Sequence, residues 1–481
     1  LTYGAVDHLN LAVANSLAND TAWATQPVVT IQDADNNTVD INSTVTLTAS
    51  GATSVALGGT TSMDAVNGVA NFTGKGVKLT GLAGSKTLTA SISAPGNFSV
   101  DATITLGYGQ ATKLALTTDP AGFVNRANFT TQPVVTVQDV SGNTVGNSSI
   151  SIDVSIDSGA LTGTTRVRAV NGVATFAGLG KTGTIGDKVL TFSDTAGQLT
   201  TATKNFTLTH GAAHHTTLAV ASTLVNNTAF ATQPVVTIYD ADDNVVTTGS
   251  QSTQTVTLSA TGATIAGSIT MDARDGVADF TGKGVKLTGT VGSKSLTATE
   301  TGGLTATNPV TITYGSAYQL ALTRQAAGAV NGVAFTTQPQ VTVQDISGNT
   351  VTNSTASITV ETSGSVLSGN STPPTLSSGV GTFAGLKLTG AKGTYTLTYK
   401  STGLADATQS ITVGYGAATK LVLTTQPLGF VNRANFTTQP VITVQDASGN
   451  TVQNSTISID VSIDSGNLTG TTQVAAVNGI A

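Results

Sequence analysis

The chain has 481 residues and a formal net charge of −6, from 20 Lys and Arg residues against 26 Asp and Glu residues. Charged residues make up only 10% of it, against roughly 25% in an average soluble domain. The sequence offers no basic surface for nucleic acid and no apolar run of the roughly 18 residues that a membrane span needs. It has no cysteine for disulfides, thiolate metal sites or nucleophilic catalysis. The hydroxyl-rich, cysteine-free composition is typical of a secreted prokaryotic surface protein.

One motif recurs five times along the chain. It reads ATQPVVTIQDADNN at 24–37, TTQPVVTVQDVSGN at 130–143, ATQPVVTIYDADDN at 231–244, TTQPQVTVQDISGN at 336–349 and TTQPVITVQDASGN at 437–450. Two further markers keep the same order, a glycine before a Leu-rich strand and a G-V-x-x-F step. Three markers in constant order, roughly 100 residues apart, indicate one structural unit copied end to end.

These markers predict the domain boundaries. The end of a preceding repeat occupies 1–4, repeats 1 to 4 occupy 5–108, 109–210, 211–314 and 315–415, and a partial fifth repeat occupies 416–481. Repeats 1 and 3 share DAD after the strand and a TGKGVKLTG segment, which defines type A. Repeats 2 and 5, with repeat 4 closer to them than to type A, define type B. The order is A-B-A-B-B, and we expect the sequence to be a window cut from a longer array.

Apolar and polar residues alternate within short segments. In ISIDVSI, for example, Ile150, Ile152 and Val154 are separated by single polar residues, so one face would lie on a core and the other in solvent. Turn signals such as SGN and NG separate the segments, and no helical stripe is present. About seven strands in roughly 100 residues predict an all-β fold of tandem immunoglobulin-like β-sandwiches. A small closed barrel is the competing all-β fold.

Aromatic residues occupy two fixed places in each repeat. One place precedes the T-Q-P step and the other ends the G-V-x-x-F step. Because both places lie within alternating segments, we expect core anchors that replace the disulfide of antibody domains. Stacking on carbohydrate is the alternative. The residues are Trp23, Phe129, Phe230, Phe335 and Phe436 at the first place, and Phe72, Phe176, Phe280 and Phe383 at the second.

The V-x-D-x-S-G-N-x-V turn, followed some 30 residues later by N-G-V-A-x-F, resembles the bacterial Ig-like repeats of invasin- and intimin-type surface proteins. The resemblance covers all five repeats. It implies a sandwich fold and a secreted, rod-forming role, with binding carried by separate terminal domains. The low charge and the GKGVKLTG insert depart from the family pattern.

The type A loops DADNN and DADDN are candidate calcium sites. Their clustered carboxylate and amide oxygens belong to the ligand class that Ca²⁺ prefers. A plain turn is the competing interpretation, because Asp opens turns and Asn or Gly tolerates a positive φ. No EF-hand spacing with a closing Glu is present. The candidate metal ligands are Asp33 and Asp35 in repeat 1 and Asp240, Asp242 and Asp243 in repeat 3.

No pattern of an enzyme active site is found. The four histidines, His8, His210, His214 and His215, all lie where repeats meet. We expect them to be solvated or packed there rather than to bind metal, since adjacent residues of a strand point to opposite faces. No G-x-S-x-G elbow and no recurring His–acid pair is present. Candidate N-glycosylation sites include Asn128, Asn205, Asn353 and Asn435.

Two function classes follow from these features. The first is a non-enzymatic structural protein of the prokaryotic cell surface, a rod-like array that forms or spans an extracellular filament, sheath, surface layer or stalk. The mean hydropathy of +0.16 with so little charge favours self-association into a homopolymer or lattice. The alternative is an adhesin whose repeats bind a host receptor or polysaccharide. Neither needs a cofactor other than the calcium considered above, and glycans are the other candidate partner.

Overall fold

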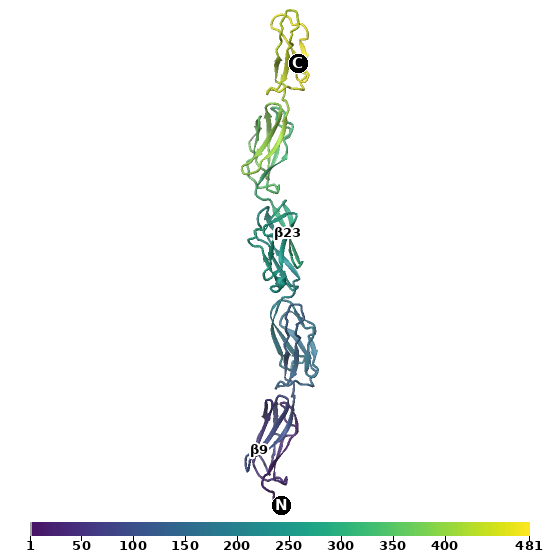
Figure 1. Cartoon of the computed structure of the whole chain (residues 1–481), viewed down its shortest axis with the longest axis vertical. Helices are drawn as coiled ribbons and strands as arrows, with labels where there is room; N and C mark the ends of the chain where they lie inside the picture. The colour runs from purple at the N-terminus through teal and green to yellow at the C-terminus, as the bar shows by residue number, and fades with distance from the viewer. Residues whose placement is uncertain (1, 371) are drawn as a thin grey trace. The chain divides into compact units, whose positions relative to one another are not determined.

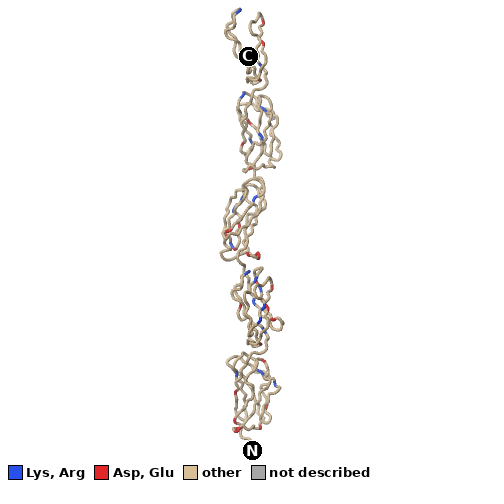
Figure 2. Tube along the Cα trace, turned by 90° about the vertical axis from the view of Figure 1, so that its right-hand side faces the viewer, with Lys and Arg blue, Asp and Glu red and all other residues tan. Residues whose placement is uncertain are grey.

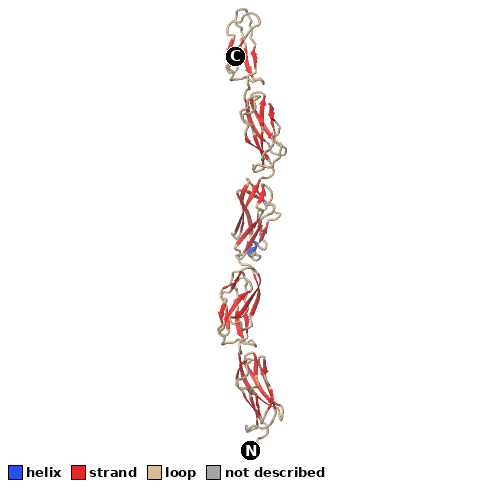
Figure 3. Ribbon diagram, turned by 180° about the vertical axis from the view of Figure 1, so that it is seen from behind, coloured by secondary structure: helices blue, strands red, loops and turns tan. Residues whose placement is uncertain are grey.

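The computed structural model describes residues 2–370 and 372–481 and consists of strands and loops (Figures 1 and 3). Leu1, which begins the predicted stub at 1–4, lies outside the described residues. The one helix in the described ranges is the 3-10 turn η1 (Ser250–Thr253), and no helix there is long and apolar enough to cross a membrane. The all-β prediction is confirmed.

The chain divides into two compact units. The first comprises 1–214 together with the loop 239–247, and the second comprises 215–238 together with 248–481. Repeats 1 and 2 therefore lie in the first unit with one loop of repeat 3. Every hydrogen-bonded sheet pairs strands from a single repeat. The repeat boundaries themselves remain predictions.

Repeat 1 is a sandwich of two sheets. A three-stranded sheet, β1-β3-β7, faces a five-stranded sheet, β2-β10-β9-β4-β6, in which β2 runs parallel to β10 and the other pairs are antiparallel. A separate ribbon pairs β5 with β8. The strands are β1 (His8–Ala12), β2 (Ser16–Ala18), β3 (Val28–Gln32), β4 (Thr44–Gly51), β5 (Val55–Gly58), β6 (Ser62–Asp64), β7 (Val69–Asn71), β8 (Lys78–Gly81), β9 (Gly84–Ile92) and β10 (Phe98–Gly107).

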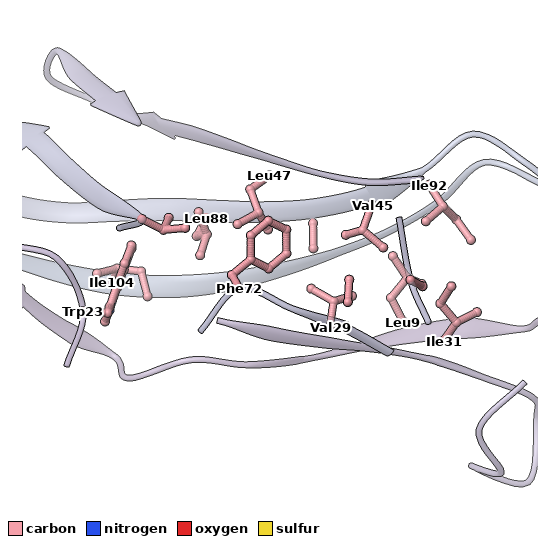
Figure 4. Close-up of a cluster of buried hydrophobic side chains, with 14 of the residues drawn as sticks. Leu9, Trp23, Val29, Ile31, Val45, Leu47, Phe72, Leu88, Ile92 and Ile104 are labelled. Carbon is pink, nitrogen blue, oxygen red and sulfur yellow. The ribbon is translucent and has the colours of Figure 1, made fainter. Parts of the chain in front are cut away.

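The core of repeat 1 lies between these two sheets (Figure 4). Val29 and Ile31 of β3 lie opposite Val45 and Leu47 of β4, and Phe72 lies among them. All five are at most 2% exposed. Burial of each such side chain contributes about 1.5–3 kcal/mol, so the period-2 pattern of the sequence is what closes the sandwich.

Repeat 2 repeats this plan with the sheets β11-β12-β16 and β15-β13-β18-β19 and the ribbon β14-β17. Ile152 and Val154 of β13 are buried, as the alternation predicts. The strands are β11 (Lys113–Thr118), β12 (Val134–Gln138), β13 (Ser151–Ile156), β14 (Ala160–Thr162), β15 (Arg166–Arg168), β16 (Val173–Thr175), β17 (Gly180–Thr182), β18 (Gly186–Asp194) and β19 (Ala202–Leu208).

Repeats 3 and 4 have the same layers. Repeat 3 contains β20 (His215–Ala219), β21 (Thr223–Val225), β22 (Val235–Tyr239), β23 (Thr255–Thr261), β24 (Thr264–Ala266), β25 (Thr270–Asp272), β26 (Val277–Asp279), β27 (Lys286–Thr288), β28 (Gly292–Glu300) and β29 (Thr305–Thr313). Repeat 4 contains β30 (Gln319–Arg324), β31 (Gln340–Gln344), β32 (Thr359–Thr362), β33 (Val366–Asn370), β34 (Val380–Thr382), β35 (Ala384–Thr389), β36 (Gly393–Lys400) and β37 (Ala407–Val413).

Repeat 5 contributes two strand pairs, β38 with β39 and β40 with β41. Its buried cluster is small and centres on Val444, Val452, Ile459 and Ala476. The strands are β38 (Lys420–Thr425), β39 (Val441–Gln445), β40 (Ser458–Asp460) and β41 (Gln473–Ala475).

The aromatic core prediction is confirmed in repeats 1 to 4. Trp23 and the equivalent Phe129, Phe230 and Phe335 are 2–3% exposed, and the second aromatic place is 0–2% exposed. The indole N–H of Trp23 donates to the carbonyl of Ala14 at 3.2 Å, which satisfies its polar atom inside the core. Phe436 of repeat 5 is half-buried.

Candidate functional site

A cluster of polar residues recurs where one repeat follows another, and we call each cluster a joint. A joint consists of an Asn from the earlier repeat, the glycine that follows the last strand of that repeat, and an Asp and a second Asn from the loop after the Q-P strand of the later repeat. Joints 1 and 2 lie in the first unit, since the loop 239–247 belongs to it, and joints 3 and 4 lie in the second. The members are Asn19, Gly109, Asp139 and Asn143; Asn125, Gly211, Asp240 and Asn244; Asn226, Gly315, Asp345 and Asn349; and Asn331, Gly416, Asp446 and Asn450.

The buried carboxylate of Asp139 is the centre of joint 1. Its Oδ2 accepts hydrogen bonds from the Asn19 side chain and the Gly109 backbone N–H, both at 2.8 Å. Its Oδ1 accepts from the backbone N–H groups of Asn143 at 2.9 Å and Ser141 at 3.0 Å. Asp139 is 0% exposed, and a buried charge is tolerated only where donors of this kind replace water.

The pKa of the Asp139 carboxyl is lowered from its ordinary value. Burial acts to raise this pKa, but the side chain of Asn143, the N–H groups of Gly109 and Asn143, and the side chain of Asn19 together favour the ionised form more strongly. Asp139 is therefore a carboxylate at neutral pH, held by neutral donors.

The second amide of the joint, Asn143, binds the backbone of the earlier repeat. Its Oδ1 accepts from the N–H of Ala83 at 2.7 Å, and its Nδ2 donates to the carbonyl of Gly81 at 3.0 Å. The N–H of Gly81 donates in turn to Oδ1 of Asn19 at 2.8 Å. We call the segment 81–84 and its equivalents 183–186, 289–292 and 390–393 the return loop. Two amide side chains thus fix its backbone from both sides.

All four joints repeat this geometry. The bond from the earlier Asn to the Asp carboxylate measures 2.8, 2.8, 2.8 and 2.7 Å in joints 1 to 4. The bond from the joint glycine N–H to the same carboxylate oxygen measures 2.8 Å in every case. The bond from the return loop to the second Asn measures 2.7, 3.0, 2.8 and 2.6 Å. The recurrence shows that each repeat carries one half of a joint at each end.

The joint glycine is required by close packing. A Cβ on Gly109 would lie 2.3 Å from the carbonyl oxygen of Asn19, and a Cβ on Gly315 would lie 2.7 Å from that of Asn226. Contacts below 3.0 Å are essentially never made by real Cβ atoms, so a side chain would push the two repeats apart. The glycine of the Y-G or H-G marker is therefore needed for close packing at the joint and does not mark a flexible linker.

Two of the candidate calcium ligands are joint aspartates or their equivalents. Asp240 is the centre of joint 2, and its pKa is lowered because hydrogen bonds from Gly211, Asn125 and Asn244 outweigh the effect of burial, which acts to raise it. Asp33 occupies the same place in repeat 1, where its carboxylate accepts from the N–H of Gly4 at 2.8 Å and from Asn37 at 2.9 Å.

The remaining candidate ligands lie in the same two loops. Asp242 pairs with Arg126 and accepts from Asn125, whereas Asp35 is exposed, and Asp243 takes a positive φ of 60° in the turn. Within the described residues no group of three or more His, Cys, Asp or Glu side chains converges on a common metal position. The calcium hypothesis stays a prediction, and an ion at Asp240 would have to displace the N–H donors that now bind it.

The histidines and the sequons lie outside the joint contacts described above. His8 contacts Asp7 at 3.0 Å, and Nδ1 of His210 lies 2.8 Å from the carbonyl of Gly211. His215 begins β20. The four candidate glycosylation asparagines, Asn128, Asn205, Asn353 and Asn435, are all exposed. The glycosylation hypothesis stays a prediction.

Sequence reasoning missed the joint asparagines. A signal was available, because an Asn precedes the first aromatic place by four residues in every repeat, at Asn19, Asn125, Asn226, Asn331 and Asn432. A second signal is the glycine pair of the return loop, which recurs although the two residues between the glycines vary.

No protein-family model and no curated protein sequence matches this chain. Among solved structures, invasin, a bacterial integrin-binding protein, is 14% identical over an alignment covering 86% of this chain and 82% of its own, with a TM-score of 0.28. Extracellular cadherin domains 1–4 of protocadherin gamma B7 are 11% identical, covering 77% of this chain and 91% of their own, with a TM-score of 0.30. An S-layer protein is 15% identical, covering 98% of this chain and 62% of its own, with a TM-score of 0.20. Invasin, whose family the motifs resemble, is thus among the similar chains, and the likeness concerns the fold alone.

Proposed function

We propose that this chain is a non-enzymatic structural protein of the prokaryotic cell surface, a rod-like extracellular array of sandwich repeats that forms or spans a filament, sheath, surface layer or stalk. The observation that carries the proposal is the joint. Four copies of one hydrogen-bonded cluster link successive repeats without a Gly/Ser or Pro linker, and a joint with so many fixed bonds limits bending between neighbours.

The chemistry of the joints supports an extracellular setting. The bonds described above are made by Asn, Asp and Gly residues and backbone groups, and none of them involves a thiol. The bonds to a buried carboxylate are screened by salt far less than surface ion pairs are. Such a joint keeps its bonds across changes in redox state and ionic strength outside the cell.

Self-association is the second part of the proposal. Lys, Arg, Asp and Glu are sparse along the trace (Figure 2). The β-turn that leads into the G-V-x-x-F step begins with an exposed valine in three repeats: Val66, Val170 and Val477 are 68–71% exposed. An apolar side chain at a repeated place on a low-charge surface is what lateral packing between copies would use.

The test is to image the purified full chain by electron microscopy and to measure its mass by light scattering as concentration rises. The proposal expects extended particles that associate into fibres or sheets, with weaker association when the three valines are changed to Ser. Compact, bent particles that stay monomeric at high concentration would overturn it. Saturable binding of the monomer to a host receptor or polysaccharide would instead establish the adhesin alternative.

A further inference from the structure

Two positions beside each joint differ between the two repeat types. The residue immediately after the joint Asn, which we call the corner residue, is Asp20, Arg126, Asn227 or Gly332 in joints 1 to 4. The residue two places after the joint Asp, which we call the loop residue, is Ser141, Asp242, Ser347 or Ser448. The loop residue contacts the joint Asn in every joint, at 3.3, 2.9, 2.9 and 3.3 Å. The corner and loop positions are therefore structurally equivalent across the chain.

The corner of joint 2 holds a two-point ion pair. Nε of Arg126 donates to Oδ2 of Asp242 at 2.8 Å, and Nη2 donates to Oδ1 at 2.7 Å. Two parallel N–H···O bonds fix both distance and orientation. Both residues belong to the first unit. Hydrogen bonds from Arg126 lower the pKa of the Asp242 carboxyl to about 2, with Asn125 and the N–H of Gly183 acting in the same direction.

The corner residue of joint 1 is acidic, whereas that of joint 2 is basic, and its ion pair lies within its own repeat. Asp20 pairs with Lys78 of its own repeat at 2.7 Å rather than with the next repeat. Lys78 holds the pKa of the Asp20 carboxyl below its ordinary value, while Asp139 acts in the opposite direction, so this corner already contains two interacting carboxylates. A third carboxylate at position 141 would be repelled. The loop residue there is a neutral serine.

These corners correlate with repeat type. The corner residue is an arginine in the type B repeats 2 and 5, at Arg126 and Arg433. The loop residue is acidic only in type A repeats, at Asp35 and Asp242. In type A repeats the corner residue is Asp20 or Asn227, and the loop residue of the repeat that follows is a serine. Where type B follows type B, at joint 4, the corner is Gly332 and the loop residue is Ser448.

We infer that the corner and loop residues specify which repeat type each end accepts: an Arg corner is a docking surface for the acidic loop of a type A repeat, and an acidic corner excludes that loop and accepts a type B repeat. By this rule the partner that fits Arg433 is a type A repeat. The inference deepens the proposed function by naming the neighbour of an end whose corner residue is charged. It concerns the joints and does not depend on lateral assembly.

The test uses the full chain and hydrogen exchange of the joint N–H groups. At joint 2 the reporters are Ile185 and Gly211, whose N–H groups donate to the side chains of Asn244 and Asp240 rather than to the mutated residues. Asp242→Ser and Arg126→Asn each remove the ion pair while copying residues found at other joints. We expect each variant to speed exchange roughly threefold, the scale of a partly exposed ion pair, and the double variant to be no faster than either single variant. Unchanged exchange in both single variants, or additive effects in the double variant, would overturn the inference.

A reciprocal test at joint 1 separates charge matching from simple loss of a contact. Ser141→Asp places an acidic loop opposite Asp20, and we expect faster exchange at Gly81, Ala83 and Gly109. Adding Asp20→Arg recreates the pair of joint 2, and exchange should return at least to the wild-type rate. Asp20→Asn alone controls for loss of the Lys78 contact. Slower exchange in Ser141→Asp, or no rescue by Asp20→Arg, contradicts the inference even if the chain still forms fibres or rods.

Discussion

The side-chain amide of Asn19 donates a 2.8 Å hydrogen bond to the carboxylate of Asp139, which lies 120 residues further along the chain and in the next repeat. Asn19 is 1% exposed and Asp139 is 0% exposed. Removing such an amide leaves a buried acceptor with one donor fewer, and a buried unsatisfied group costs about 1–3 kcal/mol.

Replacing the equivalent Asn226 by Ala tests this cost at joint 3. We expect the free energy of local opening to fall by about 1–3 kcal/mol, because Asp345 and the N–H of Gly289 both lose a partner. Hydrogen exchange at Gly289, Val291 and Gly315 measures it. The matched control is Asn227→Gly at the adjacent exposed position, where glycine suits the φ of 58°. Equal effects in the two variants would show that the side chain of Asn226 does not stabilise the joint.

Gly109→Ala tests the steric requirement at joint 1. The added Cβ would lie 2.3 Å from the carbonyl oxygen of Asn19, and we expect overpacking to destabilise the joint by about 1–3 kcal/mol. The control is Gly107→Ala, two residues earlier, where a Cβ would lie 3.8 Å from the nearest atom, the carbonyl oxygen of Leu17. Limited proteolysis at the junction reports the difference. If the Gly109→Ala chain resists proteolysis as well as the Gly107→Ala chain, the joint accommodates the added Cβ without loss of stability.

Acid should open the joints only well below neutral pH. The pKa values of Asp139 and Asp345 are lowered from the ordinary value of 3.8. An opened joint therefore binds protons more readily than a closed one, so the stabilisation is complete above 3.8 and is lost as pH falls through the lowered values. We expect constant joint protection from pH 7 to about 5 and progressive loss below about 4. Asp139→Asn should weaken joint 1 at neutral pH and flatten this dependence, and a loss of protection that begins near pH 6 would contradict a cause in these aspartates.

Lys181 lies where the other complete repeats place Leu79, Leu287 and Leu388, and all four are at most 1% exposed. Its ammonium donates to the carbonyl of Thr182 at 2.5 Å, and burial lowers its pKa, with Lys188 acting in the same direction. We expect Lys181→Leu to stabilise repeat 2 by about 1–3 kcal/mol, and Leu79→Lys to destabilise repeat 1. Hydrogen exchange of the β18 and β9 amides measures each.

The same lysine gives a pH dependence of the same sign as that of the aspartates, but in an alkaline rather than an acidic range. A lowered folded pKa means that the unfolded repeat binds more protons, so stability rises as pH rises through the folded pKa and levels off near the ordinary value of 10.5. Lys181→Leu should abolish this alkaline rise. If the variant keeps the rise, another group causes it.

Calcium binding to the type A loops is tested by thermal melting with millimolar Ca²⁺ or EGTA. We expect equal melting temperatures, because the oxygens of Asp33 and Asp240 already accept N–H donors. A ligand that binds the folded state raises its stability by mass action. A rise with Ca²⁺ that Asp35→Asn and Asp242→Asn remove would therefore establish the metal site.

The sandwich could be predicted because its signal is local. The alternation around Ile152 and Val154 and the fixed aromatic Phe176 report burial residue by residue, and all three are buried. The alternation alone does not report how much of the apolar face of a strand is covered by other strands. Within the described residues the equivalent strand of repeat 5, β40, pairs with β41 alone, and Ile457 and Val461 at its ends are 46% and 40% exposed despite the same pattern.

The joint could not be predicted because its parts are distant in sequence. The loop at Asp240 has the composition of both a turn and a calcium site, and nothing within the loop shows that Asn125, 115 residues earlier, supplies a donor. The residue types of a polar cluster identify its chemistry only when their partners are known. The corner pair of Arg126 and Asp242 is hidden for the same reason.

The return loop is held through its backbone, and this affects how such an array changes over generations. Its two inner residues are Leu82 and Ala83 in repeat 1 but Ala391 and Lys392 in repeat 4, while the bonded N–H and C=O groups stay in place. An in-frame duplication of one repeat copies a complete half-joint at each end. A gene of this kind can therefore lengthen or shorten by recombination between repeats. A new neighbour whose loop residue suits the corner residue meets a ready-made connection, and the inner residues of its return loop are free to diverge.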